Sequence, residues 1–319
     1  MRPPLNALIV GAGAVGQAYG FHLAQGGAKV TYMVREKYQA DMADGLAVRC
    51  LNSRHKGRHH FTDYGAISGL EAVSAQSWDQ VWLCVSSPAL RAGWLPDLAG
   101  AIGDATVVML QPGIDDYGYV TDLIAAERVV HGMITLTSFH APLDGAADEP
   151  SMDWWFPPMS PAPFAGEEAR TLAAVSALKA GGMPAKRVKD IDTQLRLGSG
   201  ILMPIIASLE ASQWRFSLLR KGDAIALASR AALQATRLTL PGKLSWLKRL
   251  LTHRLVLRLI LFIAPKATPF DLEAMLRVHF TKVGGQTREM LQRYIALGAE
   301  RDEPTDAIST LLARITQLG

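Results

Sequence analysis

The sequence predicts an α/β fold, in which a doubly wound parallel sheet is followed by an all-α carboxy-terminal domain. Short apolar segments rich in strand formers alternate with helix-periodic segments as far as about Lys189. Such alternation is typical of parallel sheets covered by helices. From Ile191 onward the chain is helix-periodic, interrupted mainly by Pro241-Gly242 and Pro265.

The length and composition of the chain favour two folded domains. Its 319 residues exceed the length of an ordinary domain, which contains roughly 100–200 residues. Hydrophobic residues make up 49% and charged residues 19%, which is enough apolar material for globular cores. We therefore expect a sheet domain over residues 1–189 and a helical domain, for substrate binding or dimerisation, over residues 190–319.

The chain is expected to begin with a strand, a glycine-rich turn, a helix and a second strand. Strand formers predict strands at Leu5–Val10 and Lys29–Val34. Between them, small and apolar side chains follow helical spacing at Val15, Ala18, Tyr19 and Leu23. A strand, a helix and a strand within about 30 residues predict a βαβ unit.

The turn Gly11-Ala12-Gly13-Ala14-Val15-Gly16 carries the spacing of a dinucleotide-binding motif. In such a motif the first glycine permits the tight turn, the second lets the backbone approach a pyrophosphate, and the third lets the helix pack closely on the strand. Free amides at the start of the helix bind the anion. We expect all six residues to contact a dinucleotide, and the domain to be of the Rossmann type.

The residues after the second strand favour NADP(H). NAD-binding units usually place Asp or Glu here, to bind the ribose hydroxyls, whereas Val34 is followed by Arg35 and, two residues on, by Lys37. A guanidinium grips phosphate oxygens bidentately, so Arg35 is expected to bind the 2′-phosphate. The alternative interpretation is a solvated arginine.

Further elements are expected along the rest of the amino-terminal domain. The segment 140–164 is rich in proline and is interpreted as loops around one short strand. The other expected strands are Gly45–Cys50, Gln80–Val85, Thr106–Leu110, Val129–Leu136 and Lys186–Val188, and the expected helices are Ala89–Ala99, Asp115–Ala125 and Glu167–Ala180.

At three places the sequence resembles the ketopantoate reductase (2-dehydropantoate 2-reductase) family. These are Ile9–Gly16 together with Arg35, the strand and turn Val107–Gly113, and the late segment Gly298–Thr305. The resemblance implies a Rossmann domain joined to a helical domain, and reduction of a 2-oxo acid by NADPH, as in pantothenate biosynthesis. It also implies cofactor contacts at Ser86, Gln111 and Gly113, and a lysine that protonates the developing alkoxide.

The chain departs from the family pattern where the chemistry is expected. Ser86 stands where the family usually has a lysine, and Pro112 replaces an asparagine that would offer an amide. The position of the family's catalytic lysine falls on Leu195, next to Arg196. The expected asparagines fall on Ser199 and Met203, and the late acidic residue falls near Gln286.

The candidate catalytic residues are therefore Arg196, His279 and Lys282, with Ser199 and Gln286 as candidate substrate-binding residues. Arg196 is suited to binding a carboxylate but is a poor proton donor. The spacing i, i+3, i+7 puts His279, Lys282 and Gln286 on one face of an expected helix within Pro269–Tyr294. The alternative for each residue is a solvated helix surface.

Three functions remain open: a reductase of a small 2-oxo acid, a catalytically silent NADP(H)-binding protein, and a reductase of an imine or larger carbonyl compound. The third rests on the apolar cluster Trp154-Trp155-Phe156, whose alternative role is packing between domains.

Other functional classes have little support. The run His55–His60 holds three histidines, but Arg and Lys neighbours would repel a metal ion, so no metal is expected. Nothing resembles a nucleic-acid module, and no apolar run reaches the roughly 20 residues of a membrane span.

Cys50 and Cys84 are expected to be buried thiols, because the protein is expected to be cytoplasmic. A homodimer is an open alternative to a monomer. A basic stripe has two interpretations, a solvated helix face or a site for a membrane surface or acidic partner; it comprises Lys243, Lys248, Arg249, Arg254 and Arg258.

Overall fold

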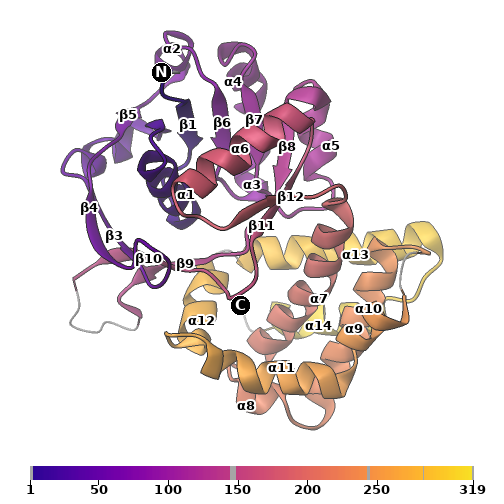
Figure 1. Cartoon of the computed structure of the whole chain (residues 1–319). Helices are drawn as coiled ribbons and strands as arrows, with labels where there is room; N and C mark the ends of the chain where they lie inside the picture. The colour runs from indigo at the N-terminus through magenta and orange to yellow at the C-terminus, as the bar shows by residue number, and fades with distance from the viewer. Residues whose placement is uncertain (1–2, 144–148, 243–244, 283, 318–319) are drawn as a thin grey trace. The chain divides into compact units, whose positions relative to one another are not determined.

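The computed structural model describes residues 3–143, 149–242, 245–282 and 284–317. The chain divides into two compact units, residues 1–191 and 192–319 (Figure 1). The first unit contains all the strands that the structure describes, and the described part of the second is helical. The predicted fold class, a doubly wound sheet followed by a helical region, is confirmed.

The main sheet of the first unit has eight strands in the order β12-β11-β8-β7-β6-β1-β2-β5. Its pairs are parallel except for β11 against β8. The strand order reverses between β1 and β6, and in such sheets ligands bind at the carboxyl ends of the strands beside this reversal. The bounds are β1 Asn6–Val10, β2 Lys29–Met33, β5 Gly65–Ile67, β6 Gln80–Leu83, β7 Thr106–Met109, β8 Val129–Gly132, β11 Ala162–Ala165 and β12 Ala185–Arg187.

Both faces of this sheet are buried. Ala7 and Ile9 of β1 belong to one apolar cluster, and Leu8 and Val10 belong to another, as expected when successive side chains point to opposite faces. The helices of the unit are α1 Ala14–Gln25, α2 Leu70–Ser74, α3 Ser87–Leu90, α4 Leu95–Ala101, α5 Asp116–Thr121 and α6 Glu168–Ala180, with short 3₁₀ turns η1 Glu36–Tyr38, η2 Ala40–Met42 and η3 Ala126–Arg128. The expected helix Ala89–Ala99 is therefore two short helices, α3 and α4.

A second sheet of four strands has the order β4-β3-β10-β9. The expected strand at Gly45–Cys50 exists as β3 but lies in this sheet and not in the parallel one. The interpretation of 140–164 as loops around one strand is wrong, since β10 pairs with both β9 and β3, and β11 joins the main sheet. The bounds are β3 Leu46–Cys50, β4 Gly57–Phe61, β9 Thr137–Ala141 and β10 Ser151–Trp155.

The second sheet packs on α1 through a buried histidine. His22 Nδ1 donates to Gly181 O at 2.8 Å, and its Nε2 accepts from Trp154 Nε1 at 3.0 Å, which fixes the neutral tautomer. Trp154 and Phe156 are buried around it, within the first unit. Their rings are core side chains there, so neither the interpretation as packing between domains nor a role in contacting substrate is supported for them.

The second unit packs its long helices directly on one another. Gly200 of α7 lets this helix approach α9, because a Cβ at that position would lie 3.2 Å from the Thr236 Cα. None of the helices that the structure describes combines the length and apolar composition that crossing a bilayer requires. The bounds are α7 Asp192–Ala211, α8 Phe216–Leu219, α9 Gly222–Thr239, α10 Trp246–Leu251, α11 Arg254–Ala267, α12 Leu272–Lys282, α13 Gly284–Arg301 and α14 Asp306–Thr316.

The environment of His22 predicts a loss of stability in mild acid. Burial lowers the pKa of His22 to about 4, although the hydrogen bond to Gly181 opposes this. The unfolded chain then binds more protons than the folded chain between about pH 4 and 6.5, so the free energy of unfolding should fall by roughly 2 kcal/mol from pH 7 to pH 5. Urea unfolding at the two pH values measures it.

His22→Gln should flatten this pH dependence, whereas His60→Gln, a change of an exposed histidine on β4, should preserve it. An equal slope in the wild type and in His22→Gln would contradict the assignment.

Candidate active site

Two glycines of the turn between β1 and α1 are required by the fold itself. Gly11 has a φ of +100°, and a Cβ there would lie 3.0 Å from Cys84 O. A Cβ at Gly16 would lie only 1.9 Å from Gly11 O. These contacts seat the start of α1 against β1 and against the segment that follows β6.

Gly13 is not explained by the fold. Its φ of −75° is open to any residue, and a Cβ there would have nothing within 4 Å. The position is exposed, directly before the first residue of α1. A glycine that neither the backbone nor the packing requires leaves open the close approach of a ligand, as in the pyrophosphate sites of dinucleotide-binding turns.

The start of α1 suits an anion. The amides of Ala14, Val15 and Gly16 lie in the first turn, where no intrahelical acceptor exists. This turn has no acidic residue, and the cap residue, Gly13, offers no side chain. The positive end of the helix dipole adds to this potential. The predicted contact set from Gly11 to Gly16 thus fits a phosphate group.

Arg35 lies where it was expected, just after β2. The strand end is tied to the turn because Gly11 N donates to Met33 O at 3.2 Å. The Arg35 side chain is exposed. Lys37, in contrast, holds its ammonium 4.8 Å from the centroid of the Tyr38 ring. Of the two cations, Arg35 is therefore the better placed for a phosphate on the ribose.

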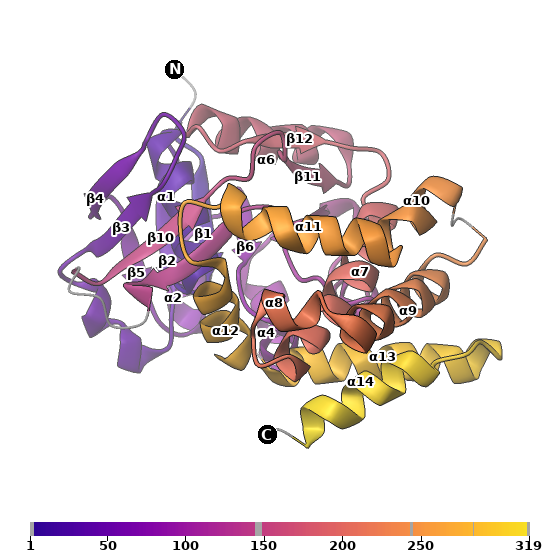
Figure 2. The same cartoon turned by 90° about the horizontal axis from the view of Figure 1, so that it is seen from below.

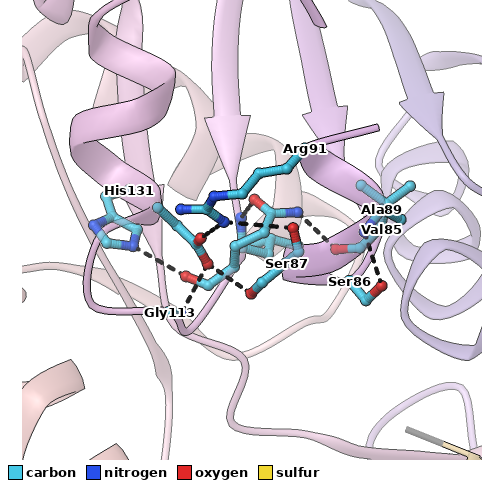
Figure 3. Close-up of polar contacts among 10 residues, drawn as sticks. Val85, Ser86, Ser87, Ala89, Arg91, Gly113 and His131 are labelled. Carbon is cyan, nitrogen blue, oxygen red and sulfur yellow. Dashed lines mark hydrogen bonds and ion pairs between the residues drawn. The ribbon is translucent and has the colours of Figure 1, made fainter. Parts of the chain in front are cut away.

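The segments that follow β6 and β7 are joined by Gln111. Its Nε2 donates to Leu83 O at 2.9 Å and to Val85 O at 2.8 Å, and its Oε1 accepts from Leu110 N at 3.1 Å (Figure 3). The side chain is buried, and its amide is engaged by the main chain. Gln111 was expected to contact the cofactor. Because its side-chain amide is bonded to main-chain groups, it would instead hold the segments after β6 and β7 in place beside the cofactor.

Ser86 directly precedes α3 and caps it, since its Oγ accepts from Ala89 N at 3.4 Å. The residue follows β6 directly after the segment on which Gly11 rests. The expected cofactor contacts of the first unit, from the glycine turn to Ser86, are thus brought to one edge of the main sheet. A hydroxyl stands here in place of the ammonium that the resemblance implies.

A buried carboxylate that the sequence analysis did not identify holds the same edge. Asp116 Oδ2 accepts from Ser87 Oγ at 2.6 Å and from Gly113 N at 2.8 Å, and Oδ1 is paired with Arg91 (Figure 3). A Cβ at Gly113 would lie 2.4 Å from Asp116 Oδ2. Gly113, expected to contact cofactor, is therefore required by this carboxylate.

His131 is a further side chain that sequence reasoning missed. It lies at the end of β8, buried, with its ring stacked on Tyr117 at a centroid distance of 5.4 Å. Its Nε2 lies 3.4 Å from Gln111 O (Figure 3).

For Asp116 the sequence offers one local signal, its position just after Gly113 at an expected helix start. Its ion pair with Arg91 joins residues 25 apart in the chain, and no periodic pattern in the sequence predicts such a pair.

In the second unit, Arg196 lies on α7 and is paired with Asp192. Its Nε is 2.7 Å from both carboxylate oxygens. Ser199 is buried one turn later on the same helix, and its Oγ donates to Arg196 O at 3.4 Å. Both predicted residues thus make polar contacts within α7, Arg196 through its Nε and Ser199 through its hydroxyl.

His279 and Lys282 lie on α12, one turn apart and exposed. The prediction that Gln286 shares their helix is wrong. His279 and Lys282 belong to α12, whose described residues run to Lys282, and Gln286 belongs to α13, whose described residues begin at Gly284. Desolvation and then the charge of Lys282 lower the pKa of His279.

Two histidines of the run 55–60, His55 and His59, pack against α1, and His60 is exposed. His59 Nε2 lies 2.8 Å from His55 O, and both rings contact Phe21 of α1. Residues 57–61 form β4, so His59 and His60 lie on a strand of the second sheet. Among the residues that the structure describes, no group of three or more His, Cys, Asp or Glu side chains is arranged to bind a metal ion.

Comparison with protein families matches residues 7–145 to the model described as ketopantoate reductase PanE/ApbA. The resemblance stated from the sequence is confirmed by this match, which lies in the first unit. A search of curated protein sequences finds no match for the chain.

Solved structures of the same fold cover nearly the whole chain. The 2-dehydropantoate 2-reductase of Geobacter metallireducens GS-15 has a TM-score of 0.72 at 16% identity, with 99% of this chain and 100% of that chain covered. A PanE/ApbA family ketopantoate reductase of Ralstonia eutropha JMP134 has 0.73 at 17%, with 98% of each chain covered. A ternary structure of D-mandelate dehydrogenase with NADH and anilino(oxo)acetate has 0.72 at 14%, with 98% and 97% covered. At these identities the similarity establishes the fold.

The open space at Gly13 predicts that a single methyl group there weakens binding of a nicotinamide dinucleotide without unfolding the protein. Gly13→Ala should cost at most about 1 kcal/mol of stability, while the steric overlap with bound nucleotide should raise its Kd roughly 5- to 150-fold. Thermal unfolding and calorimetry with NADPH measure the two effects.

Gly100→Ala is the matched control, since a Cβ at Gly100 in α4 also has nothing within 4 Å. It should leave the Kd unchanged. Equal affinity of the wild type and Gly13→Ala would show that no ligand approaches this turn.

Proposed function

Because residues 7–145 match the family model described as ketopantoate reductase PanE/ApbA, we propose that the chain reduces a small 2-oxo acid to the 2-hydroxy acid with NADPH. The observation that carries this proposal is Gly13, which is exposed, unconstrained and directly before the free amides of α1. The fold shared with D-mandelate dehydrogenase, solved with NADH and anilino(oxo)acetate, supports a 2-oxo acid as the substrate class.

The first unit would hold the dinucleotide along the edge already described. The amides at the start of α1 would bind the pyrophosphate, and Arg35 would bind the 2′-phosphate. The bound nicotinamide supplies the hydride for the keto carbon. Gln111 and Asp116 would position the segments after β6 and β7 against the cofactor. Gln111 donates to main-chain carbonyls of the first segment, and Asp116 accepts from the Ser87 hydroxyl and from Gly113 N.

The proton for the developing alkoxide must come from a side chain other than the family lysine. Arg196 is engaged by Asp192 and rarely gives up a proton. The lowered pKa of His279 leaves its ring mostly neutral at pH 7. We therefore assign proton donation to Lys282, whose ammonium is exposed at the end of α12. Ser199 and Gln286 remain candidates for contacting the substrate carboxylate.

A second candidate function is binding of NADP(H) without catalysis. It is favoured by the contacts of the polar residues themselves, since Gln111 is engaged by main chain and Arg196 by Asp192. Such a protein would show the nucleotide affinity of the first unit but no turnover. The two candidates differ in one measurement, oxidation of NADPH in the presence of 2-oxo acids.

Arg35→Ala should weaken binding of NADPH but not of NADH. Loss of a charge-assisted contact to the 2′-phosphate costs about 1.5–3 kcal/mol, or roughly 10- to 150-fold in Kd. Fluorescence titration with both nucleotides measures the ratio. Lys37→Ala, which removes the neighbouring cation over Tyr38, serves as the control and should have a smaller effect. Equal loss for both nucleotides would reject the phosphate contact.

The wild type should oxidise NADPH with at least one of a panel that includes ketopantoate, phenylglyoxylate and pyruvate. Lys282→Met should lower kcat by about 100-fold or more while the Kd of NADPH stays unchanged, since only proton donation is removed. Lys266→Met, on α11, is the control of equal chemistry. Tight binding of NADPH without turnover on any substrate would favour the silent protein instead.

A further inference from the structure

The helices α10 and α11 expose an unusual number of large apolar side chains. Trp246 is 76% exposed, Leu255 62% and Leu259 57%. We call this set the α10–α11 face; it comprises Trp246, Leu250, Leu251, Leu255, Leu259, Ile260, Phe262 and Ile263. Large contiguous apolar surfaces on a folded protein usually mark an interaction site.

Only a narrow stripe of α11 packs on the rest of the second unit. Leu257 and Leu261 are buried, in a cluster with Ile225 and Ala228 of α9. At 100° per residue, Leu259 lies on the side of α11 opposite this stripe, and Leu255, Phe262 and Ile263 lie on the same side as Leu259. The helix therefore has two apolar faces, one packed on its own unit and one exposed (Figure 2 shows α11 on the side toward the viewer).

The charged residues of α10, of α11 and of the sequence that flanks them are all basic. From Ala224 to Phe270 the sequence has eight Lys and Arg residues and no Asp or Glu, whereas the remainder of the chain has 25 Lys and Arg against 29 Asp and Glu. Arg254 and Arg258 are exposed, one turn apart, along the edge of the apolar stripe. Lys266 and Arg220 hold their cationic groups 3.6 Å and 5.1 Å from the centroid of the Phe262 ring.

A second copy of the chain would be a poor occupant of this face. In a two-fold symmetric dimer the same surface meets itself, so the cations of one copy would face a surface whose own sequence supplies only cations. No acidic residue between Ala224 and Phe270 is available to neutralise them. The same arrangement of cations at the edge of apolar and aromatic side chains matches an anionic bilayer, where phosphates lie above an acyl region.

We propose that the α10–α11 face binds the surface of a membrane containing anionic phospholipid. The exposed apolar side chains enter the boundary between headgroups and acyl chains, and Arg254 and Arg258 contact lipid phosphates through their long side chains. The helix lies in the plane of the membrane and does not cross it, in keeping with the lengths of the described helices. The proposal is independent of the reaction proposed above.

Flotation of the purified full chain with vesicles tests the proposal. The wild type should float with vesicles of equal parts phosphatidylglycerol and phosphatidylcholine, should bind far less to phosphatidylcholine alone, and should lose affinity as NaCl is raised. Arg254→Gln/Arg258→Gln should weaken binding roughly 30-fold. Leu255→Ser/Leu259→Ser should weaken it on the order of 100-fold, because two apolar side chains lose their burial.

Lys179→Gln/Lys186→Gln is the matched control, since both lysines are exposed on the first unit, at α6 and β12. It should keep the affinity of the wild type, and thermal unfolding should show all three variants folded. Absence of binding by the wild type, or an equal loss in the control, would overturn the proposal.

Sedimentation equilibrium of the same proteins addresses the competing occupant. A wild-type dimer that Leu255→Ser/Leu259→Ser converts to monomer, without vesicle binding by either protein, would assign the face to a second copy and overturn the membrane proposal. An unchanged oligomeric state together with loss of flotation in this variant would support it.

Discussion

The contact between α1 and the turn that precedes it is the constraint on which the nucleotide edge depends. Because a side chain at Gly16 would collide with Gly11 O, only a glycine lets the helix start this close to β1. That closeness directs the free amides of the first helical turn to the carboxyl edge of the main sheet. Gly11 in turn rests on Cys84 and Val85, so the same edge carries the segment after β6.

Two buried polar groups then fix what surrounds this edge. Gln111 joins the segments after β6 and β7 through main-chain carbonyls, and Asp116 joins Ser87 with Gly113. Away from the edge, His22 links α1 to the second sheet through Trp154. Each group has its hydrogen-bonding capacity largely satisfied inside the first unit, so each stabilises one arrangement of the loops that a cofactor would meet.

The sequence alone predicted the βαβ unit and the strands at β6 and β7, because their residues are apolar on both faces of a buried parallel sheet. It failed at β4, where one half-buried position is His59, whose ring packs on Phe21 of α1. It also extended β8 too far. The strand stops at Gly132, where the absence of a side chain admits the Phe164 ring of antiparallel β11, a contact from distant sequence that has no local pattern.

Pro112 occupies the turn after β7 between two residues whose hydrogen bonds hold this turn. The turn is held on one side by the Gln111 amide and on the other by Gly113 N, which donates to Asp116. The identity of residue 112 is thus uncoupled from the integrity of the loop. A scaffold built in this way should tolerate other side chains at residue 112, so the groups offered at this point could change while the underlying architecture persists.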